Sequence, residues 1–288
     1  MKKLNFYIVD NEYIEFLKNA EQEKRGFSRV PNMDYGINRK PKFLCGIVFE
    51  INNLNYYVPV SSFKQQKPDN FLIRDKNGNV TSSLRFNYMF PAPKELLTER
   101  RISTEQDQSY KILLSQELLF CRKNAQKIQE LAQKTYKNVC KGKKLGLIHN
   151  SCDFKLLENK CLDYQKRLEI DKKIELHKQW LQSNGQAGKK LILENEQLNG
   201  YKFWQCDLSN AEIKNCDLTN CVFYADMTNT VFTNNKISGT KWIGSDIKDM
   251  KTDPVIKSSI SQTLENNKIH DVMSEKLKKN KKNKEYSI

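Results

Sequence analysis

The sequence predicts two parts of different fold class, an α+β domain over residues 1–165 and a coiled β-structure over residues 191–250. Strand-like runs bounded by turn residues are followed by helical patterns in the first part. In the second part, large apolar residues recur every five positions, a period that neither a helix nor a flat strand has. The charge differs as well: residues 1–165 hold 28 Lys and Arg against 18 Asp and Glu, whereas residues 191–250 hold 5 against 8.

The composition excludes several classes of protein. The chain has 288 residues, of which 38% are hydrophobic and 29% are charged, and it contains no long apolar run or signal-peptide pattern. We therefore expect a soluble protein of the reducing cytoplasm, since the eight cysteines include no C-x-x-C pair that would indicate a zinc ribbon or a redox motif. The net charge of +15 favours a polyanionic partner for the basic first part.

The first elements follow from side-chain type and turn residues. N-F-Y-I-V at 5–9 has the composition of a strand, and Asp10 or Asn11 can cap the helix expected at 13–20. Residues 21–41 are polar, contain two prolines and predict a long surface loop. Two further strands are expected at 43–51 and 56–60. Asn52-Asn53 marks the turn between them, so they should form a hairpin.

Helical patterns dominate the rest of the first part. Strands are predicted at 71–74 and 83–90, and the longest helical pattern runs from 110 to 140 before Gly142. Another helix is expected at 153–164, followed by a linker at 166–190 that contains an amphipathic helix at 174–181. Residues 251–288 are polar, end in a lysine-rich run and predict a solvated tail.

The expected hairpin brings chemistry-bearing residues together. Antiparallel pairing places Lys42, before the first strand, near Ser61, Ser62 and Lys64, after the second. Two ammonium groups and two hydroxyls at one sheet edge suit a phosphate, which needs positive charge and hydrogen-bond donors. The alternative is that the serines are ordinary loop residues and the lysines are solvated.

The five-residue period predicts a coil that turns one quarter per repeat. Small residues lie two positions before most of the large ones, and three of these small residues, Cys206, Cys216 and Cys221, are therefore expected to pack rather than bind metal. The period slips by one residue after Phe223. The large residues are Leu193, Leu198, Phe203, Leu208, Ile213, Leu218, Phe223, Met227, Phe232, Ile237, Trp242 and Ile247. The pattern resembles the pentapeptide-repeat family, which implies a right-handed quadrilateral β-helix capped by the helix at 174–181.

A second resemblance covers residues 1–165. The ordered segments P-K-F-L-C-G-I-V-F-E-I, Y-Y-V-P-V-S-S-F-K, F-N-Y-M-F-P and C-D-F-K-L-L-E are similar to those of the ToxN/AbiQ family, the toxin endoribonucleases of type III toxin–antitoxin systems. The resemblance implies an SH3-like barrel related to the MazF and Kid toxins, with added helices. It also implies metal-independent RNA cleavage in abortive infection, no cofactor, and inhibition by a small repeated pseudoknot RNA, in a protein–RNA assembly of unknown stoichiometry.

The same resemblance assigns roles to individual residues. The catalytic set falls on Lys64, Ser62, Ser61 and Lys42, and the early-helix tyrosine falls on Tyr13. A loop tyrosine maps to Tyr35, and Arg39 and Lys40 beside it are expected to contact RNA. We hypothesise that the lysines stabilise the transition state formed when the RNA 2′-hydroxyl attacks phosphorus, while the serines hold phosphate oxygens and a tyrosine stacks on a base or donates a hydrogen bond.

Other functions have less support in the sequence. S-S-F-K also spells the S-x-x-K nucleophile motif, but it follows a strand, Pro68 prevents a helix, and the companion S-D-N and K-T-G elements are absent. No P-loop or G-x-G-x-x-G supports nucleotide binding. The remaining alternative is a non-catalytic RNA- or protein-binding module, for example a topoisomerase-type inhibitor that uses the repeats.

Overall fold

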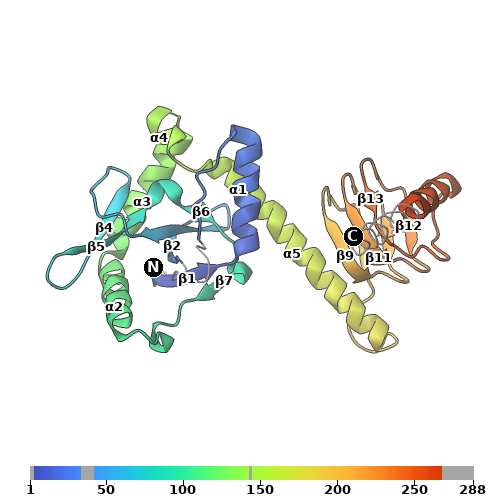
Figure 1. The fold of residues 1–288 in the computed structure, drawn as a ribbon, viewed down its shortest axis with the longest axis horizontal. Coiled ribbons are helices and arrows are strands. Elements are labelled where there is room, and N and C mark those ends of the chain that lie inside the picture. The colour runs from blue at the N-terminus through green and yellow to red at the C-terminus, as the bar shows by residue number, and fades with distance from the viewer. Residues whose placement is uncertain (1–2, 34–41, 143–144, 268–288) are drawn as a thin grey trace, which may run out of the picture. The chain divides into compact units, whose positions relative to one another are not determined.

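A computed structural model describes residues 3–33, 42–142 and 145–267, and their contacts divide the chain into two compact units, Met1–Gln165 and Lys166–Ile288. Unit 1 combines an antiparallel sheet with helices, and unit 2 contains two parallel three-stranded sheets (Figure 1). None of the helices in the described part of the chain combines the length and apolar character needed to cross a membrane.

The sheet of unit 1 has seven strands in the order β4-β5-β3-β2-β1-β7, with β6 paired to β3. All of the pairs recorded between these strands are antiparallel. The strands are β1 Asn5–Val9, β2 Leu44–Ile51, β3 Leu54–Ser61, β4 Asn70–Arg74, β5 Val80–Arg85, β6 Phe90–Pro91 and β7 Leu97–Glu99. The antiparallel sheet with its helices confirms the α+β class predicted for this part.

The helices of unit 1 are longer or more broken than the sequence pattern indicated. The single helix predicted at 110–140 is two helices that meet at Asn124, which ends α2 and begins α3. α2 packs on β4 and α3 on β2. The helices are α1 Asn11–Arg25, α2 Gln108–Lys123, α3 Ala125–Cys140 and α4 Leu145–His149, followed by α5 Phe154–Gln182.

The β2–β3 hairpin has the predicted turn. Asn52 and Asn53 both have positive φ angles, 50° and 62°, which asparagine tolerates better than other non-glycine residues. Gly46 in β2 lies so close to Tyr57 that an added Cβ would stand 2.2 Å from Cδ1 of that ring. Only glycine fits at this position of the hairpin without displacing a buried aromatic side chain.

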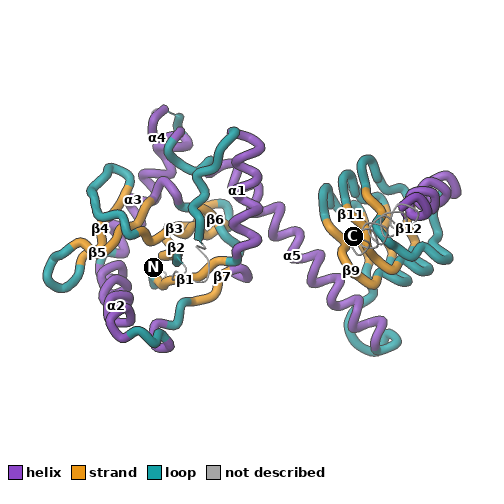
Figure 2. Tube along the Cα trace, in the orientation of Figure 1, coloured by secondary structure: helices purple, strands orange, loops and turns teal. Residues whose placement is uncertain are grey.

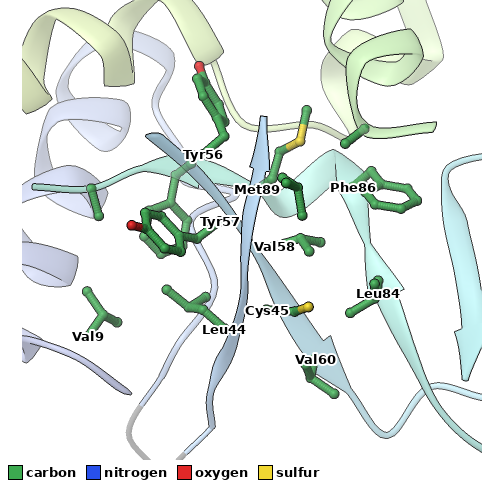
Figure 3. Packing of buried hydrophobic residues seen from close by; sticks show 14 of the residues in the cluster. Val9, Leu44, Cys45, Tyr56, Tyr57, Val58, Val60, Leu84, Phe86 and Met89 are labelled. Carbon is green, nitrogen blue, oxygen red and sulfur yellow. The ribbon is translucent and has the colours of Figure 1, made fainter. Parts of the chain in front are cut away.

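The core of unit 1 lies between the hairpin, β5 and the helices. Figure 3 shows side chains of β2 and β3, among them Leu44 and Val58, gathered against Leu84, Phe86 and Met89. The predicted strand at 83–90 is wrong in its second half: β5 ends at Arg85, and Phe86–Tyr88 forms a 3-10 helix before β6. The apolar side chains still alternate into the core past the end of β5, because Leu84 and Phe86 are 0% and 1% exposed.

Unit 2 consists of short parallel strands separated by turns (Figure 2). One sheet contains β8 Ile192–Glu194, β10 Glu212–Lys214 and β12 Val231–Thr233; the other contains β9 Lys202–Asp207, β11 Val222–Asp226 and β13 Lys241–Trp242. Isolated bridges join Gln197 to Asp217 and Asp217 to Lys236. Equivalent positions therefore return about every 20 residues, as four successive five-residue repeats require.

The repeat positions are buried as predicted. Of the twelve large residues, ten are buried in the core of unit 2, and Ile237 and Ile247 pack against it. Hydroxyls at the small positions bond to the neighbouring coil: Thr230 Oγ1 donates to the Leu208 carbonyl at 2.8 Å, and Ser245 Oγ to the Phe223 carbonyl at 3.0 Å. The one-residue slip corresponds to a register shift between β9 and β11: the coil of β11 is one residue shorter, so Gln205 in β9, with a φ of 52°, has no partner in the register.

The connection between the predicted helices at 153–164 and 174–181 is also helical. α5 continues without interruption from Phe154 to Gln182. Within it, His177 is buried, its Nδ1 accepts from the Leu191 backbone N–H at 3.1 Å, and its Nε2 therefore donates to the Ser209 carbonyl at 3.1 Å. His177 thus bonds to the first coils, as the predicted capping role requires, and burial lowers its pKa.

The first part of the expected tail contains a helix. Residues 254–267 form a helix, and Ile260 and Leu264 on it are 2% and 6% exposed in the core of unit 2. The apolar residues recur at four-residue spacing, which places them on one helix face. The lysine-rich end of the predicted tail lies outside the described residues.

Candidate anion-binding site

The β2–β3 register brings Lys42 opposite Ser61. Leu44 pairs with Pro59, and the Val60 N–H donates to the Phe43 carbonyl at 3.0 Å, so the antiparallel pairing extends one residue beyond β2. The next pair in this register is Lys42 with Ser61. The predicted meeting of the two hairpin ends therefore holds for these two residues.

Lys42 and Ser61 line the same hollow, which has a volume of about 330 Å³. The opposite wall is the segment that follows α1, from Ser28 to Asn32, and Arg85 and Tyr88 come from the end of β5 and the 3-10 helix. The lining residues are Ser28, Arg29, Val30, Pro31, Asn32, Lys42, Pro59, Val60, Ser61, Arg85 and Tyr88. The hollow thus joins three segments that are distant in the sequence.

The charge of the hollow is strongly one-sided. Arg29, Lys42 and Arg85 line it, although the Arg29 guanidinium also donates from Nε to the His149 carbonyl at 3.0 Å, and among the described residues that line it there is no carboxylate. Three hydroxyl groups, from Ser28, Ser61 and Tyr88, add donors. Cations in a partly enclosed site attract anions more strongly than the same charges in water. This arrangement suits a phosphate or another oxyanion.

The wall of the hollow is held by one buried carboxylate. Glu21 on α1 is 0% exposed, and its Oε2 accepts from Ser28 Oγ at 3.0 Å, from the Arg29 N–H at 2.6 Å and from the Val30 N–H at 3.2 Å. Its Oε1 accepts from Arg25 Nη1 at 3.1 Å and from the Asp153 N–H at 2.5 Å. Glu21 therefore fixes the backbone of residues 28–30, which forms this wall, while the Arg29 side chain donates from Nε to the His149 carbonyl at 3.0 Å.

Ser62 and Lys64 are exposed and do not line the hollow. The backbone between them is anchored, because the Phe63 carbonyl accepts from Ser83 Oγ at 2.5 Å and the Phe63 N–H donates to Ser61 Oγ at 3.3 Å. The charge of Lys64 also influences the pKa of Glu117 on α2. Burial raises the pKa of Glu117 above its usual value, and the Lys64 charge offsets part of that rise. Of the four predicted catalytic residues, therefore, Lys42 and Ser61 line one hollow, whereas Ser62 and Lys64 lie outside its lining.

The prediction that Tyr13 contacts RNA is wrong in this structure. Its side chain is 0% exposed, and its hydroxyl donates to the Pro91 carbonyl at 2.7 Å. Its ring meets the Tyr164 ring edge-on, with centroids 5.0 Å apart. Burial raises the pKa of the phenol well above its usual range. Tyr13 is a core residue that ties α1 to β6, and no face of its ring is open to a base.

The other predicted RNA-binding residues, Tyr35, Arg39 and Lys40, lie outside the described residues. Sequence reasoning missed Arg29, Arg85 and Tyr88 in the lining of the hollow. Arg85 lies in the strand predicted at 83–90, but the pairing of β5 with β3 through Ser83 and Ser61, which brings it to the serine motif, was not predicted. No pattern in the sequence indicated that the segment after α1 would close the other side.

Comparisons with known proteins identify relatives of both parts of the chain. The family described as "Toxin ToxN, type III toxin-antitoxin system" matches residues 5–161, more than half of the chain, and the family described as "Pentapeptide repeats (8 copies)" matches residues 197–223. "Endoribonuclease ToxN" of Pectobacterium atrosepticum is 28% identical over 176 residues, which are 58% of this chain and 96% of that protein. "Endoribonuclease AbiQ" of Lactococcus lactis subsp. lactis is 24% identical over 177 residues, 57% of this chain and 91% of that protein.

The fold of unit 1 also has a solved relative. A structure from work on selective toxin inhibition by a non-coding RNA pseudoknot in bacterial type III toxin–antitoxin systems aligns with a TM-score of 0.50 and 24% identity. The alignment covers 57% of this chain and 99% of the other. At this identity the likeness concerns the fold alone.

Proposed function

This chain belongs to the ToxN toxin family of type III toxin–antitoxin systems, and from that premise we propose that it is an endoribonuclease. The observation that carries the proposal is the hollow that Lys42 and Ser61 line together with Arg29 and Arg85, with no acidic residue in the described part of its lining. The curated relatives that span unit 1 are named endoribonucleases. The hollow supplies what such an enzyme needs, a place where one phosphate of a strand can be held.

The chemistry requires little beyond positioning and charge. RNA carries its own nucleophile, the 2′-hydroxyl, which attacks the adjacent phosphorus while the bond to the 5′-oxygen breaks. The proton leaves the 2′-oxygen and another is delivered to the departing 5′-oxygen. We expect products with a 2′,3′-cyclic phosphate and a 5′-hydroxyl, and full activity in excess chelator.

Lys42 and Ser61 are proposed to contact the scissile phosphate, Lys42 by its charge and Ser61 by its hydroxyl. Ser62 and Lys64 follow directly on the strand that carries Ser61, and we propose that they reach the same phosphate when RNA fills the groove. Because the Phe63 backbone is anchored, we propose that Lys64 reaches the phosphate by rotation of its long, flexible side chain.

The biological setting follows from the family. The toxin is proposed to act in the cytoplasm during abortive infection by phage, and to be inhibited by a small repeated pseudoknot RNA that occupies the groove. For the fold, we propose an SH3-like barrel in unit 1 and a quadrilateral β-helix in unit 2. The second proposal rests on the equivalence of positions about 20 residues apart.

The experiment uses purified full-length protein with total RNA and an end-group analysis. Cyclic-phosphate ends in wild-type digests, made with and without chelator, support the proposal. Lys64→Ala, Lys42→Ala and Ser61→Ala should lose most cleavage, whereas Lys94→Ala, an exposed lysine outside the hollow, should cut like wild type. Protection of RNA without cutting would refute the nuclease and support a binding protein.

A further inference from the structure

Arg85 is held in the hollow by two aromatic rings. Its guanidinium carbon lies 4.7 Å from the centroid of Phe63 and 4.7 Å from the centroid of Tyr88. Cation–π contacts orient a guanidinium but leave the hydrogen-bonding edge available, because they use the face of the group. The rings therefore determine where Arg85 points without satisfying its donors.

One donor of Arg85 is buried without an acceptor. Its Nε is shielded from solvent and has no hydrogen-bond partner among the described residues. A buried donor of this kind is unfavourable in the folded protein and is normally paired. None of the described residues that line the hollow carries a carboxylate, so an anion entering it would supply the missing acceptor.

Comparison with other arginines of unit 1 argues against a purely structural role. Arg25 donates to the Glu21 carboxylate and to the carbonyls of Ser151 and Ile148. Arg122 donates its Nε to the Leu4 carbonyl at 2.8 Å. Those arginines hold segments together through their edges, whereas the Nε edge of Arg85 has been left unpaired at the lining of a cationic hollow.

We propose that Arg85 binds a backbone phosphate of the RNA strand, through the hydrogen-bonding edge of its guanidinium. A planar fork of N–H donors fits two oxygens of a phosphate, which an ammonium cannot reproduce. This inference rests on the proposed function, since it names a residue of the same site. Because Phe63 lies within the S-S-F-K motif, the bound phosphate also stabilises the position of the segment that carries Ser62 and Lys64.

The test separates binding from cleavage. A single-stranded RNA carrying 2′-O-methyl groups throughout lacks the nucleophile, so its affinity for the full-length protein can be measured at several salt concentrations. The variants are Arg85→Ala, Arg85→Lys and the control Arg101→Ala, which removes an exposed arginine outside the hollow. Thermal unfolding of each variant identifies any loss of fold, and Arg85→Lys keeps the test valid if Arg85→Ala is unstable.

We expect Arg85→Ala to weaken binding about 10-fold, as for loss of a charge-assisted hydrogen bond. The slope of log affinity against log salt should fall by about 0.7, the value for one phosphate contact on a single strand. Arg85→Lys should keep the slope but lose affinity, and Arg101→Ala should match wild type.

Two different failures are distinguishable. If wild type binds but does not cut unmodified RNA, the proposed nuclease fails while the Arg85 comparison still stands on binding. If Arg85→Ala and Arg85→Lys bind with the affinity and salt slope of wild type, or if wild type binds no RNA, the Arg85 proposal is overturned.

Discussion

Glu21→Ala should be among the most destabilising substitutions in unit 1. The carboxylate is fully buried and accepts from three backbone N–H groups, one hydroxyl and the Arg25 guanidinium. Removing it leaves these donors without their acceptor, and breaking a buried ion pair by deleting one partner costs about 3–5 kcal/mol. We expect the free energy of unfolding of unit 1 to fall by that amount.

The assay is urea unfolding of the full-length protein followed by tyrosine fluorescence and by circular dichroism. Glu23→Ala is the matched control, because Glu23 lies on the same helix but is exposed, and it should change the free energy by less than about 0.5 kcal/mol. Glu21→Gln should fall between the two, since it keeps one oxygen acceptor but loses the charge. A free energy for Glu21→Ala within about 0.5 kcal/mol of wild type would refute the idea that this carboxylate holds the wall of the hollow.

Three further predictions concern packing and pH. Gly188→Ala places a Cβ 2.2 Å from the Leu176 carbonyl oxygen at a φ of 73°, and it should destabilise unit 2 by about 2 kcal/mol or more. The control is Gly200→Ala, which has a φ of 70° and no atom within 4 Å of the added Cβ, and it should cost only about 1 kcal/mol. Tryptophan fluorescence reports this, because all three tryptophans lie in unit 2. Burial lowers the pKa of His177 below 6.5, so the unfolded state binds more protons than the folded state as the pH falls through that value. Unit 2 should therefore be fully stable above pH 6.5 and lose stability below it, with a slope of at most about 1.4 kcal/mol per pH unit. If His177→Gln has the same pH profile of stability as wild type, this assignment is contradicted. Gly46→Ala, which forces a Cβ within 2.2 Å of an aromatic carbon, should destabilise unit 1 by about 1–3 kcal/mol in the same urea assay, and retained stability would show that the hairpin can adjust.

Much of the architecture was predictable because it depends on local patterns. The turn at Asn52-Asn53 and the β2–β3 hairpin follow from residue type alone, and the hairpin register then brings Lys42 to Ser61. The repeat in unit 2 is a stronger case, since each inward residue is fixed by a period of five. Even the slip after Phe223 marked a real feature, the coil of β11 that is one residue shorter than that of β9.

Other features could not be predicted because they depend on which segments meet in space. The interruption at Asn124 between α2 and α3 and the continuity of α5 reflect tertiary packing rather than a clear stop or start signal. The burial of Tyr13 is different, because its spacing with Phe16 and Leu17 already placed it on the apolar face of α1, and the RNA-binding role came only from the family resemblance.

By itself, therefore, the sequence determined the hairpin, the repeat and the meeting of Lys42 with Ser61, because neighbouring residues encode turns and periods. The tertiary structure alone decided that Arg29 and Arg85 complete the same hollow, that Glu21 holds its wall and that Ser62 and Lys64 lie outside its lining. Those relations join segments tens of residues apart. They follow from long-range packing, and no local pattern in the chain records them.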